Sequence, residues 1–163
     1  MTPRPAVPAD AAAVAAIYNQ GIAERTATFE TRPRHAQGIT AWLGTRYPVI
    51  AVEDDGRVVG FAASSAYRPA RDCYSGVAEF SVYVASSSRR RGAGGVAMAA
   101  LIESAERAGI WKLLSRVFVE NHASRELLRG LGFREVGIYR RHARLDGQWR
   151  DVVIVERLLW APP

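Results

Sequence analysis

Apolar residues recur at two different spacings along the chain, and the spacing changes several times. After Asp10, the residues Val14, Ile17 and Tyr18 stand at i, i+3 and i+4, which places them on one face of a helix. Aspartate is a common helix N-cap. This segment therefore predicts a helix over residues 10–22 that begins at Asp10.

A shorter helix and a hairpin are expected next. Residues around Ile39 and Trp42 have helical spacing, and Pro48 ends that pattern. Residues 49–53 and 58–62 are rich in valine and are separated by a turn that contains a glycine. This arrangement predicts two antiparallel strands.

Residues 77–84 are the most strand-like part of the chain, because they are rich in β-branched and aromatic side chains. Successive side chains of a strand point to opposite faces. One face then carries Val77, Glu79, Ser81 and Tyr83, and the other carries Ala78, Phe80, Val82 and Val84. Glu79 is thus a carboxylate inside a segment that otherwise forms a strand.

The second half of the chain begins with a core-facing helix, predicted from Ala97, Leu101, Ala105 and Ala108, with Gly109 where a C-cap belongs. The later patterns predict a strand over 113–119, a helix over 124–131, and strands over 136–139 and 152–158, with Asp146-Gly147 as a hairpin signal. The whole order predicts one mixed α/β domain over residues 1–163 without repeats.

Composition excludes several protein classes. The chain has 163 residues, of which 48% are apolar and 23% charged, as in ordinary globular domains. No apolar run approaches the ~20 residues that span a bilayer, and no signal-peptide pattern opens the chain. We therefore expect a cytoplasmic protein without membrane partners. The single cysteine, Cys73, and the three histidines have no metal-ligand spacing, so no metal is expected.

The charge balance favours anionic partners, because 22 basic residues stand against 16 acidic ones. Nucleic acid is one such partner, but no aromatic stacking pattern or helix-turn-helix spacing accompanies the arginines. A polyanionic cofactor is therefore the better expectation.

The most informative segment is Arg89-Arg90-Arg91-Gly92-Ala93-Gly94-Gly95, which lies between the strongest strand and the strongest helix. Free N–H groups at a helix N-terminus bind phosphate, and glycines let the backbone approach it closely. The segment lacks the Gly-Lys-Ser/Thr of a Walker loop and the third glycine of a dinucleotide fingerprint. A solvated turn with an arginine run is the alternative interpretation.

At this point the sequence resembles the GNAT acetyltransferases. Their pyrophosphate loop has the form [Q/R]-x-x-G-x-[G/A], which Arg89, Gly92 and Gly94 match. A second match is Asn121-His122-Ala123-Ser124 followed by Leu131-Gly132-Phe133, similar to the family's N-x-x-S and L-G-F segments. The resemblance implies a twisted, mostly antiparallel sheet flanked by about four helices and splayed between strands 4 and 5.

The likeness narrows to the phosphinothricin, methionine sulfoximine and arsinothricin N-acetyltransferases, which act in detoxification and resistance. The matching residues are Ile17-Tyr18-Asn19, Thr28-Phe29-Glu30-Thr31, Tyr74, Glu79, Ser81-Val82-Tyr83-Val84 and Gly147-x-Trp149-x-Asp151. Phe80 and Asp146 depart from the pattern of that branch, which leaves the exact substrate open. The resemblance also implies a homodimer, with the strands near Trp149 contributing to the shared surface.

Acetyl transfer to an amine requires an acceptor for the ammonium proton, because free amines are mostly protonated at neutral pH. Burial of Glu79 would favour its acting as the general base. A structural pairing of Glu79 with an arginine such as Arg71 is the alternative, and the resemblance favours the catalytic role. For the leaving thiolate, the position where many GNAT enzymes have a tyrosine is Leu128, so Tyr83 or water remains as the acid.

The resemblance implies two sets of binding residues. Acetyl-CoA, the cosubstrate, is expected on Val82, Tyr83, Val84, Arg89, Arg90, Arg91, Gly92, Ala93, Gly94, Gly95, Asn121 and Ser124. A small amino-acid-like substrate is expected on Phe29, Arg68, Arg71, Tyr74 and Glu79, where the arginines would bind anionic groups. A GNAT-like module that binds CoA without catalysis, and an enzyme for an unrelated amine such as an aminoglycoside or a protein N-terminus, are the alternatives.

Overall fold

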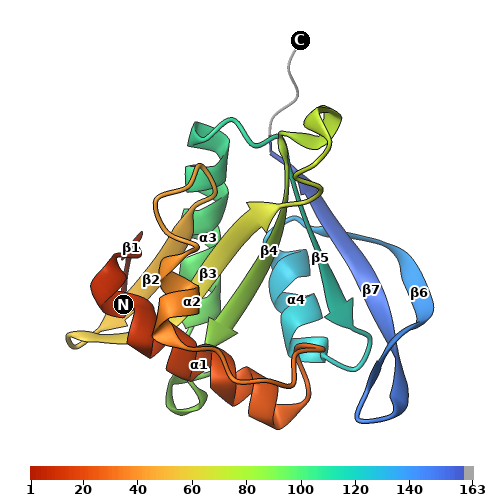
Figure 1. Cartoon of the computed structure of the whole chain (residues 1–163), viewed down its shortest axis with the longest axis horizontal. Helices are drawn as coiled ribbons and strands as arrows, with labels where there is room; N and C mark the ends of the chain where they lie inside the picture. The colour runs from red at the N-terminus through yellow and green to blue at the C-terminus, as the bar shows by residue number, and fades with distance from the viewer. Residues whose placement is uncertain (160–163) are drawn as a thin grey trace.

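The computed structural model describes residues 1–159, which form a seven-stranded mixed sheet with helices on both faces (Figure 1). The strands follow the order β1-β2-β3-β4-β5-β7-β6 across the sheet. Their bounds are β1 (Thr2–Pro5), β2 (Val49–Asp54), β3 (Arg57–Ala66), β4 (Val77–Val84), β5 (Lys112–Phe118), β6 (Arg134–Leu145) and β7 (Gln148–Leu158). This arrangement confirms the predicted mixed α/β fold class.

Four α-helices flank the sheet: α1 (Ala11–Glu24), α2 (Ala36–Thr40), α3 (Ala93–Arg107) and α4 (His122–Gly130). Short 3-10 turns are η1 (Pro8–Asp10), η2 (Asp72–Tyr74) and η3 (Ser86–Ser88). None of the helices in residues 1–159 has the length and apolarity needed to cross a membrane. That the chain is one domain over 1–163 stays a prediction, and residues 160–163 lie outside the described residues.

The sheet is splayed between β4 and β5, as expected from the resemblance. These two strands are parallel and pair only where Val77–Glu79 lie opposite Lys112–Leu114. Beyond Glu79, β4 keeps β3 as its partner up to Val84, while β5 continues beside β7. The strands therefore diverge, and their ribbons form a V in Figure 1.

Two apolar cores lie on opposite faces of the sheet, and β4 contributes to both. Ala78, Phe80, Val82 and Val84 pack into the core beneath α3, together with Met98 and Leu101. Tyr83 packs into the core beneath α1, beside Phe61. The predicted alternation of β4 is thus confirmed, and Glu79 and Ser81 lie on the α1 face.

The first helix begins as predicted, but Asp10 does not cap it through its side chain. The carboxylate instead accepts the N–H of Val7 at 2.8 Å and pairs with Arg4 at 2.7 Å. The hydrogen bonds from Arg4 hold the pKa of the Asp10 carboxyl below its usual value. Arg4 belongs to β1, an edge strand that was not predicted from the sequence, and it also bonds Glu53 of β2 at 3.0 Å.

Other boundaries differ in detail. The second helix, α2, ends at Thr40, so that Trp42 lies in the turns that follow. The helix α3 agrees with its pattern, and Gly109 follows it with a left-handed φ of +74°. The strand β6 is longer than predicted and carries a register shift between Tyr139 and Ala143.

Candidate active site

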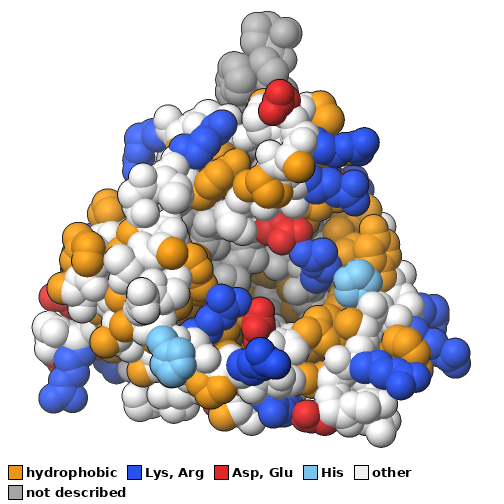
Figure 2. All heavy atoms as spheres, in the orientation of Figure 1, with side chains coloured by type: hydrophobic (Ala, Val, Ile, Leu, Met, Phe, Trp, Pro, Cys, Tyr) orange, Lys and Arg blue, Asp and Glu red, His pale blue; other side chains and the backbone are white. Residues whose placement is uncertain are grey.

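A cavity of about 740 Å³ lies in the opening between β4 and β5. Figure 2 shows this face hollowed near its centre, with acidic and basic side chains around the hollow. Its walls come from α1, the α1–α2 connection, β4, β5, α4 with the residue that precedes it, and β6. The lining residues are Tyr18, Ala27–Arg32, Glu79–Tyr83, Ser115–Phe118, Asn121, Ser124, Leu128, His142 and Ala143.

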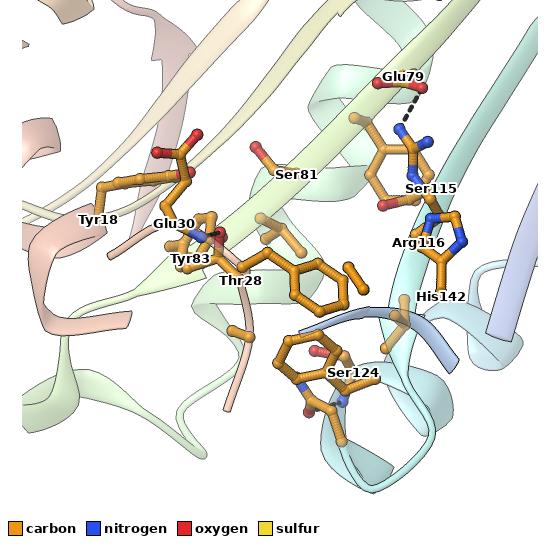
Figure 3. Close-up of a pocket in the computed structure, with 18 of the residues that line it drawn as sticks. Tyr18, Thr28, Glu30, Glu79, Ser81, Tyr83, Ser115, Arg116, Ser124 and His142 are labelled. Carbon is orange, nitrogen blue, oxygen red and sulfur yellow. Dashed lines mark hydrogen bonds and ion pairs between the residues drawn. The ribbon is translucent and has the colours of Figure 1, made fainter. Parts of the chain in front are cut away.

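Glu79 and Arg116 form an ion pair across the opening, as Figure 3 shows. The guanidinium Nη2 donates to Oε1 of Glu79. The Glu79 side chain is 27% exposed and that of Arg116 is 41% exposed. Glu79 is thus partly exposed rather than buried. The alternative interpretation, a pairing of Glu79 with an arginine, is present in the structure, but the partner is Arg116 and not Arg71. The catalytic role of Glu79 stays a prediction.

Sequence reasoning missed Arg116. The signal was an arginine inside the strand-like segment Lys112–Phe118, but a single strand pattern does not reveal which other strand it faces. The parallel register supplies that information, because Glu79 lies opposite Leu114 and Arg116 stands two residues further along the diverging strand.

Tyr83 forms the floor of the cavity on the α1 side. Its ring contacts Tyr18 and Phe61, with centroids 4.8 and 5.5 Å away. Burial raises the pKa of the Tyr83 phenol, and the neighbouring Tyr18 adds to the effect. Such a phenol gives up its proton less readily than an exposed one.

The α1–α2 connection covers the cavity, and its C-terminal end is bonded to α1. Asn19 accepts the N–H of Arg34 at 2.7 Å and donates to its carbonyl at 2.9 Å. Within the connection, Phe29 packs edge-on against Phe118, with centroids 4.8 Å apart. Phe29, one of the predicted substrate residues, thus lines the cavity.

Asn121 and Ser124, predicted to contact CoA, also line the cavity. Asn121 is the N-cap of α4 and accepts the N–H of Ser124 at 3.2 Å. Its amide also donates to the carbonyl of Thr26 at 3.4 Å. This contact joins α4 to the α1–α2 connection across the opening.

The predicted phosphate loop precedes α3. Gly92 has a φ of +90° and is the N-cap residue, with no side chain that caps the helix. The first helical bond from this end runs from the N–H of Val96 to the carbonyl of Gly92 at 3.1 Å. The N–H groups of Ala93, Gly94 and Gly95 therefore stand at the positive end of a 15-residue helix.

The arginines of this loop have different surroundings. Arg89 bonds both carboxylate oxygens of Glu24, at the end of α1, at 2.9 Å. Arg91 pairs with Asp54 at 3.0 Å. Arg90 is exposed and has a φ of +60°. Two of the three arginines thus hold the loop against neighbouring elements.

The loop adjoins the open part of β4. A Cβ atom at Gly94 would lie 3.5 Å from a methyl group of Val84 and 3.1 Å from one of Leu127 in α4. The structure therefore brings the loop, the end of β4 and α4 together at one end of the opening.

The remaining predicted substrate residues, Arg68, Arg71 and Tyr74, belong to the β3–β4 connection and are not among the lining residues. Arg68 lies over the rings of Tyr67 and Tyr74, 5.3 and 5.9 Å from their centroids. Their contact with a substrate stays a prediction. In residues 1–159, no three His, Cys, Asp or Glu side chains gather in a way that could hold a metal ion.

Comparisons with known proteins identify related chains. The family model described as acetyltransferase (GNAT) family matches residues 15–133. The L-methionine sulfoximine/L-methionine sulfone acetyltransferase of Pseudomonas aeruginosa is 32% identical, over 91% of this chain and 88% of that protein. The phosphinothricin N-acetyltransferase of Streptomyces coelicolor is 31% identical, over 96% of this chain and 95% of that protein.

A solved structure agrees with these matches. The GNAT superfamily phosphinothricin acetyltransferase of Sinorhizobium meliloti, in complex with acetyl-CoA, has a TM-score of 0.90 and 28% identity, and the match covers 97% of this chain and 88% of that one. The resemblance found in the sequence is confirmed for the family and for its phosphinothricin and methionine sulfoximine relatives.

Proposed function

We propose which amine this enzyme acetylates. The chain belongs to the acetyltransferase (GNAT) family and catalyses acetyl-CoA-dependent N-acetylation. The acceptor that we propose is the α-amino group of a small amino-acid-like molecule. Phosphinothricin, methionine sulfoximine and arsinothricin are the three acceptors that we propose, and acetylation would detoxify them. The observation that carries this proposal is the position of Glu79, on the cavity wall at the point where β4 loses β5 as its partner.

Two features of the structure fit acetyl-CoA, which supplies the thioester. The free N–H groups at the start of α3 suit its phosphates, with Arg89–Gly95 as the surrounding loop. The open edge of β4 suits its extended pantetheine arm, which can pair with Val82–Val84 like an added strand. Asn121 and Ser124 close the same end of the cavity.

The residues of the cavity divide the chemistry between them. Glu79 accepts the proton of the substrate ammonium, directly or through water, so that a neutral amine can attack. Backbone N–H groups of Val82–Val84 stabilise the oxyanion that the attack produces. Leu128, at the position of the family's tyrosine, is 1% exposed and has no proton to donate, so water or Tyr83 protonates the leaving thiolate.

Thiol release from acetyl-CoA, measured with the three proposed acceptors, tests the function. We expect turnover with at least one of these acceptors and little turnover with an aminoglycoside or a peptide N-terminus. Activity only on the latter two would refute the acceptor class. Acetyl-CoA binding without turnover of any of these amines would favour the non-catalytic module.

We further propose a cytoplasmic homodimer. Its contact surface would include the outer strands β6 and β7, where Val136, Ile138, Tyr139 and Trp149 are 47–55% exposed. Exposed large apolar side chains that gather on neighbouring strands commonly mark an interaction surface.

A further inference from the structure

We propose that the ion pair between Glu79 and Arg116 is the subsite for the zwitterionic head of a free α-amino acid. Glu79 binds the ammonium group that it later deprotonates, and Arg116 binds the α-carboxylate. The inference rests on the proposed function, because it assumes that the acceptor amine reacts beside Glu79. It makes Arg116 a specificity-determining residue.

The backbone geometry aims both side chains into the cavity. Glu79 pairs with Leu114, and this is the last residue pair between β4 and β5. Arg116 lies two residues further along β5 and so shares the face of Leu114. The alternate residues Leu113 and Val117 pack into the core beneath α3. Arg116 is therefore directed away from that core and toward the α1 face, where Figure 3 shows it facing Glu79.

Both side chains keep hydrogen-bonding groups that the ion pair does not occupy. Within the described residues, one hydrogen bond, from Nη2 of Arg116 to Oε1 of Glu79, joins the two. A guanidinium has five N–H donors, and a carboxylate has two acceptor oxygens. Both groups line the cavity and are 27 to 41% exposed, so a ligand can reach them. Ion pairs this exposed contribute little to folding stability, so packing and stability alone do not account for its position.

An α-amino acid complements this arrangement because its ammonium and carboxylate are bonded to the same carbon. Its two charges are adjacent, as are those of Glu79 and Arg116, and each can face an opposite charge. The guanidinium fork matches a carboxylate through two parallel hydrogen bonds. A peptide N-terminus or a simple amine offers the ammonium alone and leaves the guanidinium without its second partner.

The other arginines near the site are less suited to the α-carboxylate. Arg68 and Arg71 lie outside the cavity lining. Arg32 does line the cavity, but it comes from the α1–α2 connection. Among the described residues, Arg116 is the one arginine bonded to Glu79, and the α-carboxylate must lie within a few bonds of the reacting amine.

A matched pair of acceptors tests the assignment: an α-amino acid that the enzyme acetylates, and its α-carboxamide, which keeps the amine and side chain but lacks the charged carboxylate. We expect the wild type to prefer the acid by about 10²-fold or more in kcat/KM, because a site built for a polar group rejects an analogue that lacks it. In Arg116→Gln this preference should collapse toward one, mainly through a higher KM for the acid. Arg116→Lys should be intermediate, because it keeps the charge and loses the fork.

Arg107→Gln removes a charge from the exposed surface of α3, where the side chain is 70% exposed, and should leave the preference unchanged. Unchanged acetyl-CoA affinity would show that each variant is folded. Equal losses for acid and carboxamide in Arg116→Gln, or a wild type indifferent to the carboxylate, would overturn the assignment.

Calorimetry of the two acceptors in the presence of CoA separates this inference from the proposed function. If no acceptor were turned over, the proposed function would fail. If the wild type bound the acid more tightly than the carboxamide, and Arg116→Gln lost this difference, the subsite would still be supported. Equal affinity of the wild type and Arg116→Gln for the acid would refute it.

Discussion

The ring of Tyr83 lies directly on Gly21 of α1, so closely that a Cβ atom at Gly21 would be 2.7 Å from Cε1 of the ring. The glycine thus allows α1 to approach β4 and lets Tyr83 form the floor of the cavity. Glycine inside a helix costs about 1 kcal/mol relative to alanine, so its presence here reflects this contact.

Gly21→Ala should therefore destabilise the protein despite the better helix propensity of alanine. Overpacking costs about 1–3 kcal/mol, and the displaced ring of Tyr83 should raise the KM of the acceptor. Thermal denaturation and steady-state kinetics measure the two effects. Gly38→Ala in α2 is the control, because a Cβ atom there meets nothing within 4 Å, and it should not destabilise. A gain in stability in Gly21→Ala would show that the ring adapts freely.

Glu79→Gln keeps the shape of the side chain and removes its ability to accept a proton. General-base assistance is worth about 10²–10⁴-fold, so kcat should fall by that factor while acetyl-CoA affinity stays the same. Glu103→Gln, on the exposed side of α3 with 70% of the side chain accessible, is the control. A variant that retained more than about a tenth of kcat would mean that solvent or another group takes the proton, and that Glu79 only positions the ammonium.

Valine in the phosphate loop should weaken acetyl-CoA binding. Gly92 has a φ of +90°, which valine adopts only with strain. A side chain at Gly94 would crowd Leu127 and the approach to the N–H groups. Gly92→Val and Gly94→Val should both bind more weakly by calorimetry, whereas Arg90→Ala should have a smaller effect. Unchanged affinity in Gly94→Val would contradict the assignment of the loop.

The pairing of Asp10 with Arg4 should make stability depend on pH. Because the pKa of Asp10 is lowered in the folded protein, its stabilisation is fully present above the unfolded value of about 4 and is lost as pH falls through the lower folded pKa. Asp10→Asn should cost about 1–3 kcal/mol at neutral pH and flatten this acid dependence. Urea denaturation at several pH values measures both, and an identical acid profile in the variant would count against the pairing.

Light scattering at micromolar concentration should give the mass of a dimer. Trp149→Glu would place a charge among the exposed apolar side chains of β6 and β7 and should shift the equilibrium toward monomer. Glu103→Gln again serves as the control. A monomeric mass for the wild type under these conditions would refute the proposed homodimer.

Local patterns predicted the central elements because each pattern is contained in one segment. The alternation of β4 and the helical spacing of Ala97, Leu101 and Ala105 both describe side chains that are buried as expected. The edge strand β1 was missed because Pro3 and Pro5 are unfavourable in strands and are tolerated at an edge.

Features that depend on distant partners could not be predicted. Asp10 has the residue type of an N-cap, but Arg4 and the N–H of Val7 occupy its carboxylate. Arg116 lies 37 positions from Glu79, and their contact follows from the parallel register, which no single pattern contains. Arg68 and Arg71 were selected for their charge, and their contact with a substrate stays a prediction.

The short pairing between β4 and β5 also bears on which molecules can pair with the sheet. Where the two strands diverge, the edge of β4 from Phe80 to Val84 has no neighbouring strand among the described residues, and an open edge is a template for pairing with other chains. Here β5 on one side and the α1–α2 connection above recess that edge within the cavity. A slender extended ligand can reach it, whereas a strand from another folded protein would bring its own sheet and collide with the walls. The divergence of β4 and β5 that opens the site therefore also limits which molecules can pair with the open edge of β4.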